Sequence, residues 1–168
     1  EKYPEALIFA GTVMTPAQAE LAVNSGVSGI ISADYIPEVL EIAVKSDVLC
    51  VPGGISDAGK QLVKKAELYE CTLEELKENH PYQWIYKLFP AVTPERSNMD
   101  IPSAWRGPFK GLDIIYTGGV NLKNLEELVR KDPEGIFCGS ALTKNISEPE
   151  KMKDDVEKWL EIIHPTQK

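Results

Sequence analysis

The sequence is poor in the residues that build metal sites and disulfide frameworks. It has three cysteines and two histidines, and no two cysteines stand in a C-x-x-C spacing. An odd cysteine count without ligand spacing argues against both a structural zinc site and a disulfide scaffold. Cys50 and Cys138 lie in apolar runs, which predicts small core residues, while His80 and His164 each precede a proline and are interpreted as surface positions. The sequence therefore predicts a metal-free protein of a reducing, cytoplasmic compartment.

Positive charge and long apolar runs are also scarce. The 18 Lys+Arg residues against 26 Asp+Glu give a net charge of −8, which argues against non-specific nucleic-acid binding. No basic amphipathic stretch suggests binding to a membrane surface. The longest nearly apolar run, Leu7–Met14, is far shorter than the roughly 20 residues of a membrane span, and no signal peptide opens the chain. What remains is the composition of one globular domain, with 43% hydrophobic residues.

Short apolar runs recur along the chain, each flanked by Gly or Pro. Runs of this kind are typical of strands that are covered on both faces. The third run ends in Pro52-Gly53-Gly54, which we interpret as a turn. The predicted strands are Ala6–Val13, Gly29–Ala33, Val48–Val51, Trp84–Ala91, Leu112–Thr117 and Gly135–Cys138.

Helical periodicity lies between most of these runs. The long connection Ser56–Gln83 predicts two helices, the second beginning near Thr72, because Thr72 and Glu75 form a capping-box pattern. The other predicted helices are Pro16–Asn24, Pro37–Lys45, Asn121–Arg130 and Glu150–Ile163. Alternating strands and helices predict an α/β fold with a parallel sheet. Two architectures remain, an open doubly wound sheet or a (β/α)₈ TIM barrel whose first two βα units lie upstream.

Lys87 stands in the middle of the fourth predicted strand. By the alternation of a strand, Ile85, Lys87 and Phe89 share one face, while Tyr86 and Leu88 share the other. Burial would favour the neutral amine, which is the nucleophile that a Schiff base needs. The alternative is a lysine near a strand end that reaches water.

Two glycine-containing turns follow the last two predicted strands. Gly118-Gly119 comes before Asn121, a predicted helix cap, and Gly139-Ser140 follows the final strand. Glycines let backbone N–H groups approach an anion, and in barrels the loops after the last two strands often bind phosphate. The alternative is a tight turn that needs a positive φ angle.

Three further residues stand at strand ends or in loops. Thr12 ends the first strand, where its hydroxyl could hold a carboxylate or could belong to a plain strand residue. Asp34 is either a helix-entry residue or a site group. We interpret Arg106 as a residue that organises its loop.

Taken together, these motifs resemble the 2-dehydro-3-deoxy-phosphogluconate / 4-hydroxy-2-oxoglutarate aldolase family. The resemblance runs from about Leu7 to Leu142. It implies a metal-free, cofactor-free class I aldolase on a TIM barrel, usually a homotrimer, that acts on a small keto-acid sugar in the Entner–Doudoroff pathway. The motifs that carry it are Ala10-Gly11-Thr12-Val13, Lys87-Leu88-Phe89-Pro90-Ala91, Gly107-Pro108-Phe109, Thr117-Gly118-Gly119-Val120-Asn121 and Gly139-Ser140.

The resemblance also implies roles for individual residues. Lys87 matches the Schiff-base lysine, Thr12 the carboxylate-binding threonine, and Phe89 the aromatic residue beside the lysine. Thr117 would line the substrate pocket. The residues that match the phosphate-binding turns are Gly118, Gly119, Gly139 and Ser140.

The chain departs from the family pattern in two places. It reads Ser32-Ala33-Asp34 where the family often has Ser-Pro-Gly. It also begins before the third barrel strand, so the family's acid/base glutamate is not among its residues. We expect residues 1–168 to form a single partial barrel domain, covering about strands 3 to 8, with about 60 further residues upstream.

The predicted reaction is retro-aldol cleavage of a 2-keto-3-deoxy sugar acid to pyruvate and an aldehyde, either glyceraldehyde 3-phosphate or glyoxylate. One rival is a phosphate-binding barrel without a Schiff base, such as a sugar-phosphate epimerase or isomerase relative. The mid-strand position of Lys87 counts against it. The other rival is a binding module, which no motif positively supports.

Overall fold

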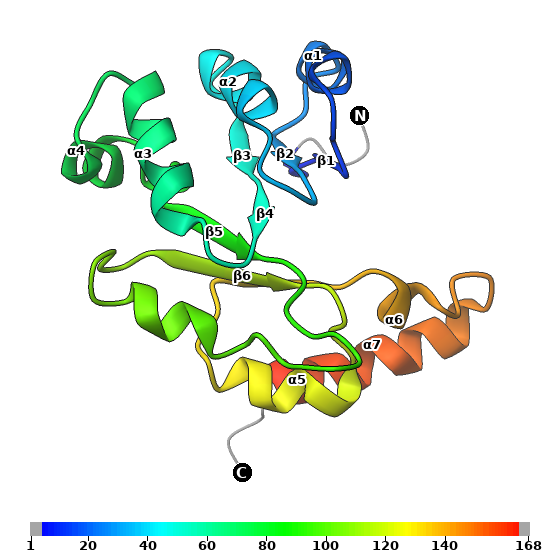
Figure 1. The fold of residues 1–168 in the computed structure, drawn as a ribbon. Helices are drawn as coiled ribbons and strands as arrows, with labels where there is room; N and C mark the ends of the chain where they lie inside the picture. The colour runs from blue at the N-terminus through cyan, green and yellow to red at the C-terminus, as the bar shows by residue number, and fades with distance from the viewer. Residues whose placement is uncertain (1–4, 165–168) are drawn as a thin grey trace.

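The computed structural model describes residues 5–164, which alternate between parallel strands and helices (Figure 1). The strands are β1 (Phe9–Gly11), β2 (Gly29–Ile31), β3 (Leu49–Val51), β4 (Gly53–Gly54), β5 (Ile85–Leu88), β6 (Asp113–Thr117) and β7 (Gly135–Phe137). The helices are α1 (Pro16–Asn24), α2 (Pro37–Lys45), α3 (Ala58–Leu68), α4 (Leu73–Asn79), α5 (Leu122–Val129), α6 (Ser140–Thr143) and α7 (Pro149–Ile163). Two short 3₁₀ turns, Pro81–Gln83 and Ile101–Trp105, precede β5 and β6. The predicted α/β fold with parallel strands is confirmed.

The strands form two parallel sheets, β1-β2-β3 and β4-β5-β6-β7. They meet at Pro52, which separates β3 from β4 and has no N–H to give to a ladder. Backbone bonds cross this interruption, because Ser32 N–H donates to Val51 O at 3.3 Å and Gly53 N–H donates to Ser32 O at 3.0 Å. The interpretation of Gly53-Gly54 as a turn is therefore wrong: the two glycines pair with Lys87 and Leu88 as strand β4.

Side-chain caps mark the starts of α1, α4 and α5. The predicted ranges of α1 and α2 agree with the structure at both ends. The long connection contains two helices as predicted, and Thr72 caps the second with a reciprocal bond to Glu75. Asn121 caps α5 in the same way through Asn124. The strands are shorter than the apolar runs, because the ends of those runs leave the ladder to enter turns.

Apolar side chains pack on both faces of the strands. One cluster joins β5 and β6 to α5 and α7, with Tyr86, Leu88 and Trp159 among its members. A second cluster packs α1 and α2 on β1–β3 around Ile30 and Leu40. On the opposite face of the strands, Val51, Ile85 and Ile115 form a small separate layer. The helices thus cover the outer face, and the inner face carries this small apolar layer.

Candidate active site

Lys87 projects from β5 on the inner face of the sheet. It is 3% exposed, and its Nζ donates a hydrogen bond to the carbonyl oxygen of Ser32. The neighbours Tyr86 and Leu88 belong to the outer cluster, as the alternation of the strand predicts. Burial lowers the pKa of Lys87 to about 8, from an ordinary value of 10.5. A useful fraction of this amine is therefore neutral and nucleophilic near neutral pH.

The cavity beside Lys87 has a volume of about 370 Å³ and lies at the carboxyl ends of the strands. Thr12 lines it from the end of β1, and Thr117 lines it from the end of β6. The ring of Phe89 also lines it, with its centroid 5.4 Å from the Lys87 Nζ. The structure therefore brings Lys87, Thr12, Phe89, Thr117 and Gly139 to one cavity, although they are far apart in the sequence.

Thr12 adopts an uncommon backbone conformation. Its φ angle is +55°, in the left-handed region that β-branched residues avoid. Strained residues of this kind cluster at functional sites, where the surrounding structure holds them in place. This conformation lies where the chain turns from β1 toward α1. Thr12 is exposed and lines the cavity.

The Gly118-Gly119 turn lines a second cavity of about 370 Å³. Both glycines have positive φ angles, 84° and 72°, and a Cβ on Gly119 would lie 2.1 Å from the carbonyl oxygen of Val92. The side-chain amides of Asn121 and Asn124 each donate to Gly119 O at 3.0 Å, which ties the turn to the start of α5. The turn therefore has the positive φ angles that the tight-turn interpretation requires, and a cavity also lies beside it.

Gly139 and Ser140 line the same second cavity from the other side, where α6 begins. Within residues 5–164, the backbone N–H groups of Gly118, Gly119 and Ser140 donate no hydrogen bond to another residue. Unpaired N–H groups around a cavity can donate to a bound anion. All four predicted phosphate-turn residues therefore meet at one place.

Phe89 joins these two cavities to a third. It lines the Lys87 cavity, the glycine-turn cavity, and a cavity of about 450 Å³ that includes Asp34 and Ser56. A Cβ on Gly118 would lie 2.9 Å from the Phe89 ring, so this glycine permits close contact with the aromatic side chain. Asp34 therefore lies at a cavity, and it also accepts the N–H of Tyr35, the residue that follows it.

Some predictions from the sequence need correction or addition. The prediction that Cys138 is a core residue holds only in part: Cys138 is partly buried and packs against the cluster of β5 and β6, but unlike the buried Cys50 it also lines both the Lys87 and glycine-turn cavities. Its position directly before Gly139 is the signal in the sequence that points to the cavity. Arg106 donates to Lys131 O at 2.8 Å, which confirms its role in organising a loop.

A second buried lysine has no counterpart among the residues singled out from the sequence. Lys65 on α3 is fully buried, and burial lowers its pKa to about 8 as well. It donates to the carbonyl oxygens of Gln83 and Ile85, at 2.8 and 3.4 Å, and lines none of the three cavities. Access to a cavity therefore distinguishes Lys87 from Lys65, and the pKa alone does not.

Within residues 5–164, no group of three or more His, Cys, Asp or Glu side chains is placed to hold a metal ion. No helix in this part of the chain is both long and apolar enough to cross a membrane.

Comparison with known proteins identifies the family. The model of the KDPG and KHG aldolase family matches residues 1–158. The chain belongs to this aldolase family. The resemblance predicted from the sequence motifs is confirmed.

Curated relatives include two enzymes named 2-dehydro-3-deoxy-phosphogluconate aldolase. The Pseudomonas aeruginosa protein is 30% identical over 127 residues, which are 76% of this chain and 50% of the relative. The Treponema pallidum protein is 28% identical, over 82% of this chain and 57% of the relative. This chain thus spans about half the length of the curated relatives that it matches.

Solved structures share the fold. A structure described as native KDPGal has a TM-score of 0.73 at 20% identity, covering 98% of this chain and 72% of that one. The KDPG aldolase of Legionella pneumophila, with pyruvate captured as a covalent carbinolamine, has a TM-score of 0.59 at 26% identity, covering 99% of this chain and 71% of that one.

Proposed function

We propose that this chain supplies the Schiff-base lysine of a class I aldolase. The substrate would be a 2-keto-3-deoxy sugar acid, either 2-dehydro-3-deoxy-6-phosphogluconate or 4-hydroxy-2-oxoglutarate, and the products pyruvate and an aldehyde. The observation that carries the proposal is the buried Lys87 with a pKa of about 8, lining one cavity with Thr12. The carbinolamine formed with pyruvate by the Legionella relative supports the same chemistry.

The reaction begins at the Lys87 amine. Neutral Nζ attacks the C2 ketone to give a carbinolamine, which loses water and forms an iminium ion. A base takes the proton of the C4 hydroxyl, and the C3–C4 bond breaks as its electron pair moves toward the iminium nitrogen. The aldehyde leaves, the resulting enamine is protonated at C3, and water releases pyruvate and the free lysine.

The other lining residues bind and orient the substrate. The hydroxyl of Thr12 donates to the carboxylate next to the imine, and the Phe89 ring and Thr117 enclose the carbon chain. The backbone amides of Gly118, Gly119, Gly139 and Ser140 donate to a distal phosphate. No carboxylate lines the Lys87 cavity in the described part of the chain, so these residues account for the imine and the anions, and proton transfer at C4 falls to another group.

The same proposal extends to architecture and assembly. We place β1, β2, the β3–β4 pair, β5, β6 and β7 as strands 3 to 8 of a (β/α)₈ barrel, with residues 1–168 as one partial domain. Six successive parallel strands and the fold of the KDPGal structure support this assignment. A homotrimer in the cytoplasm, working without cofactor in the Entner–Doudoroff pathway, completes the proposal. The relatives named above are aldolases, which does not favour the epimerase or isomerase alternative.

Trapping with pyruvate and borohydride tests the mechanism. In the full-length protein, the reduced adduct is expected on the peptide that carries Lys87, and Lys87→Ala should abolish both adduct and cleavage. Lys87→Arg should fail too, because a guanidinium stays protonated and cannot form the imine. Lys65 is the internal control, since it has a similar pKa but no cavity. An adduct on Lys65, or an active enzyme with none, would overturn the mechanism.

A further inference from the structure

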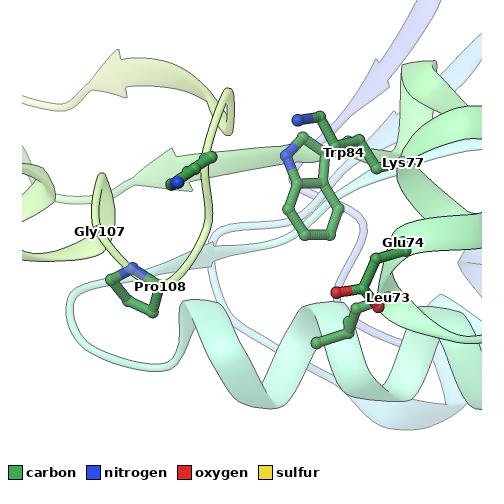
Figure 2. A pocket seen from close by; sticks show the side chains of 7 residues that line it. Leu73, Glu74, Lys77, Trp84, Gly107 and Pro108 are labelled. Atoms are coloured by element: carbon green, nitrogen blue, oxygen red, sulfur yellow. The ribbon is translucent and has the colours of Figure 1, made fainter.

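A separate cavity lies at the amino ends of β5 and β6. It has a volume of about 300 Å³ and is bounded by α4, by the residue before β5 and by the loop before β6 (Figure 2). The Lys87 cavity lies at the carboxyl ends of the same strands. Because the strands are parallel, the two cavities open at opposite ends of the sheet, and the proposed aldolase chemistry makes no use of this one.

The indole of Trp84 lines this cavity with an unused hydrogen-bond donor. Trp84 is 6% exposed, and its Nε1 is buried with no hydrogen-bond partner within residues 5–164. A buried N–H without a partner costs about 1–3 kcal/mol, so such groups are rare and call for an explanation. An acceptor atom bound in the cavity would satisfy it.

Two lysines add positive charge to the same lining. Lys77 reaches in from α4, and Figure 2 shows its side chain extending toward the indole of Trp84. Its Nζ also lies 3.3 Å from where a Cβ on Gly111 would be. Lys110 lines the cavity from the opposite loop, and neither lysine forms an ion pair with another described residue. Three hydrogen-bond donors that find no acceptor among residues 5–164 therefore border one space, a pattern suited to a carboxylate.

The remaining walls restrict the shape and charge of a ligand. Leu73, Pro108 and the indole face of Trp84 offer apolar surface. Glu74 presents its carboxylate from α4 on the side that faces Pro108 (Figure 2). A second negative charge on the ligand would meet this carboxylate at short range in a partly enclosed space, where like charges repel.

We propose that this cavity binds a small organic monocarboxylate with an apolar body. Its carboxylate accepts hydrogen bonds from Trp84 Nε1, Lys77 and Lys110, and its body packs on Leu73, Pro108 and the indole. Glu74 discriminates against dicarboxylates. The site would be a second ligand site of this chain, separate from the residues that bind the aldolase substrate.

Benzoate is a suitable probe, and the indole N–H signal of Trp84 in a ¹H–¹⁵N spectrum is a direct readout. The chain has three tryptophans, so Trp105 and Trp159 act as internal controls. Benzoate should shift the Trp84 signal saturably, and benzamide, which has the same shape without the charge, should not. Terephthalate should bind more weakly than benzoate, and Glu74→Gln should reduce that difference.

Matched lysine variants complete the test. Lys77→Met should weaken benzoate binding about tenfold, the effect of losing one charge-assisted hydrogen bond. Lys123→Met, which removes an exposed lysine on α5, should leave it unchanged. Equal shifts with benzoate and benzamide, an unmoved Trp84 signal, or unchanged affinity in Lys77→Met would each overturn the proposal. Pyruvate trapping at Lys87 is independent of all these results, so the two proposals can fail separately.

Discussion

At the scale of single residues, the structure keeps two lysines away from water and exposes only one of them to a cavity. Lys65 donates to two backbone carbonyls, whereas Lys87 has one carbonyl partner and an open side. The same burial that lowers the pKa of Lys87 must destabilise the folded chain, because a charged ammonium is removed from water. The proposed function and the stability of the fold therefore oppose each other at this position.

Replacing Lys87 by methionine should make this loss of stability measurable. The pKa is about 8 in the folded chain and 10.5 in its ordinary state, so the unfolded chain binds more protons between these values. The penalty on folding is complete below about pH 8 and fades as the pH rises toward 10.5. Lys87→Met should raise the free energy of unfolding by about 1–3 kcal/mol at pH 7, and by almost nothing above pH 10.5.

Urea unfolding of both proteins across this pH range provides the measurement. The informative quantity is the difference in the free energy of unfolding between the two proteins, because Lys65 contributes a similar pH dependence to both. A methionine variant less stable than the parent at pH 7 would show that the buried ammonium is not a net cost.

At the scale of elements, the glycine turn after β6 shows how backbone geometry and a cap work together. Gly119 combines a φ angle of +72° with close contact to Val92, and its carbonyl accepts two asparagine side chains. Gly139, the other predicted anion-binding glycine, has a negative φ angle, and no atom lies within 4 Å of the position that a Cβ would occupy. Both glycines line the same cavity, but only Gly119 has a positive φ angle and no room for a Cβ.

Alanine at each position should show this difference as a difference in stability. Gly119→Ala should cost about 2–4 kcal/mol, because it adds left-handed strain and forces a collision with Val92. Gly139→Ala, as the matched control, should stay within about 1 kcal/mol of the parent. Thermal or urea unfolding measures both, and equal losses would contradict this account of the turn.

The sequence predicts the elements best where side chains encode their ends. Thr15, Thr72 and Asn121 are caps that act on residues two or three positions ahead, so the starts of α1, α4 and α5 follow from local chemistry. Gly53-Gly54 could not be identified as a strand, because its pairing partner Lys87 lies far along the chain. Local residues define a turn or a cap, but pairing between distant segments is set by the whole sheet.

The same distinction applies to the candidate site. Alternation along one strand predicts the inward direction of Lys87, and this is confirmed. Cys138 stands directly before Gly139, a predicted site residue, but its place on the cavity wall also requires β7 to pair beside β6. The unpaired indole of Trp84 likewise becomes visible only when the loop before β6 lies across from α4.

At the scale of the whole molecule, β1 lies at one edge of its sheet among the described strands, and apolar side chains beside it face solvent. Leu7 is 73% exposed and Ile8 is 64% exposed. An exposed apolar edge strand readily pairs with another chain. We therefore expect residues 1–168, prepared alone, to self-associate with increasing concentration.

A single lysine at this edge should reduce the association. Ile8→Lys places a charge where another strand would pair, whereas Leu21→Lys changes a residue of similar exposure, 68%, on helix α1. Light scattering after size-exclusion chromatography should show a lower average mass for Ile8→Lys only. Equal behaviour of the two variants would mean that association does not run through the β1 edge.

Pro52 has a consequence for how the molecule responds to stress. The proline divides the strands into two groups, each with its own apolar cluster, and Figure 1 shows β4 where the groups meet. The Lys87 cavity draws Thr12 and Ile31 from one group and Lys87, Phe89 and Thr117 from the other. A small rotation between the groups would separate these residues and disturb the layer of Val51, Ile85 and Ile115 that the groups share, while the two outer clusters stayed packed. The proposed imine formation at Lys87 would therefore report how well the two groups are aligned, and heat or denaturant should abolish it before either group unfolds.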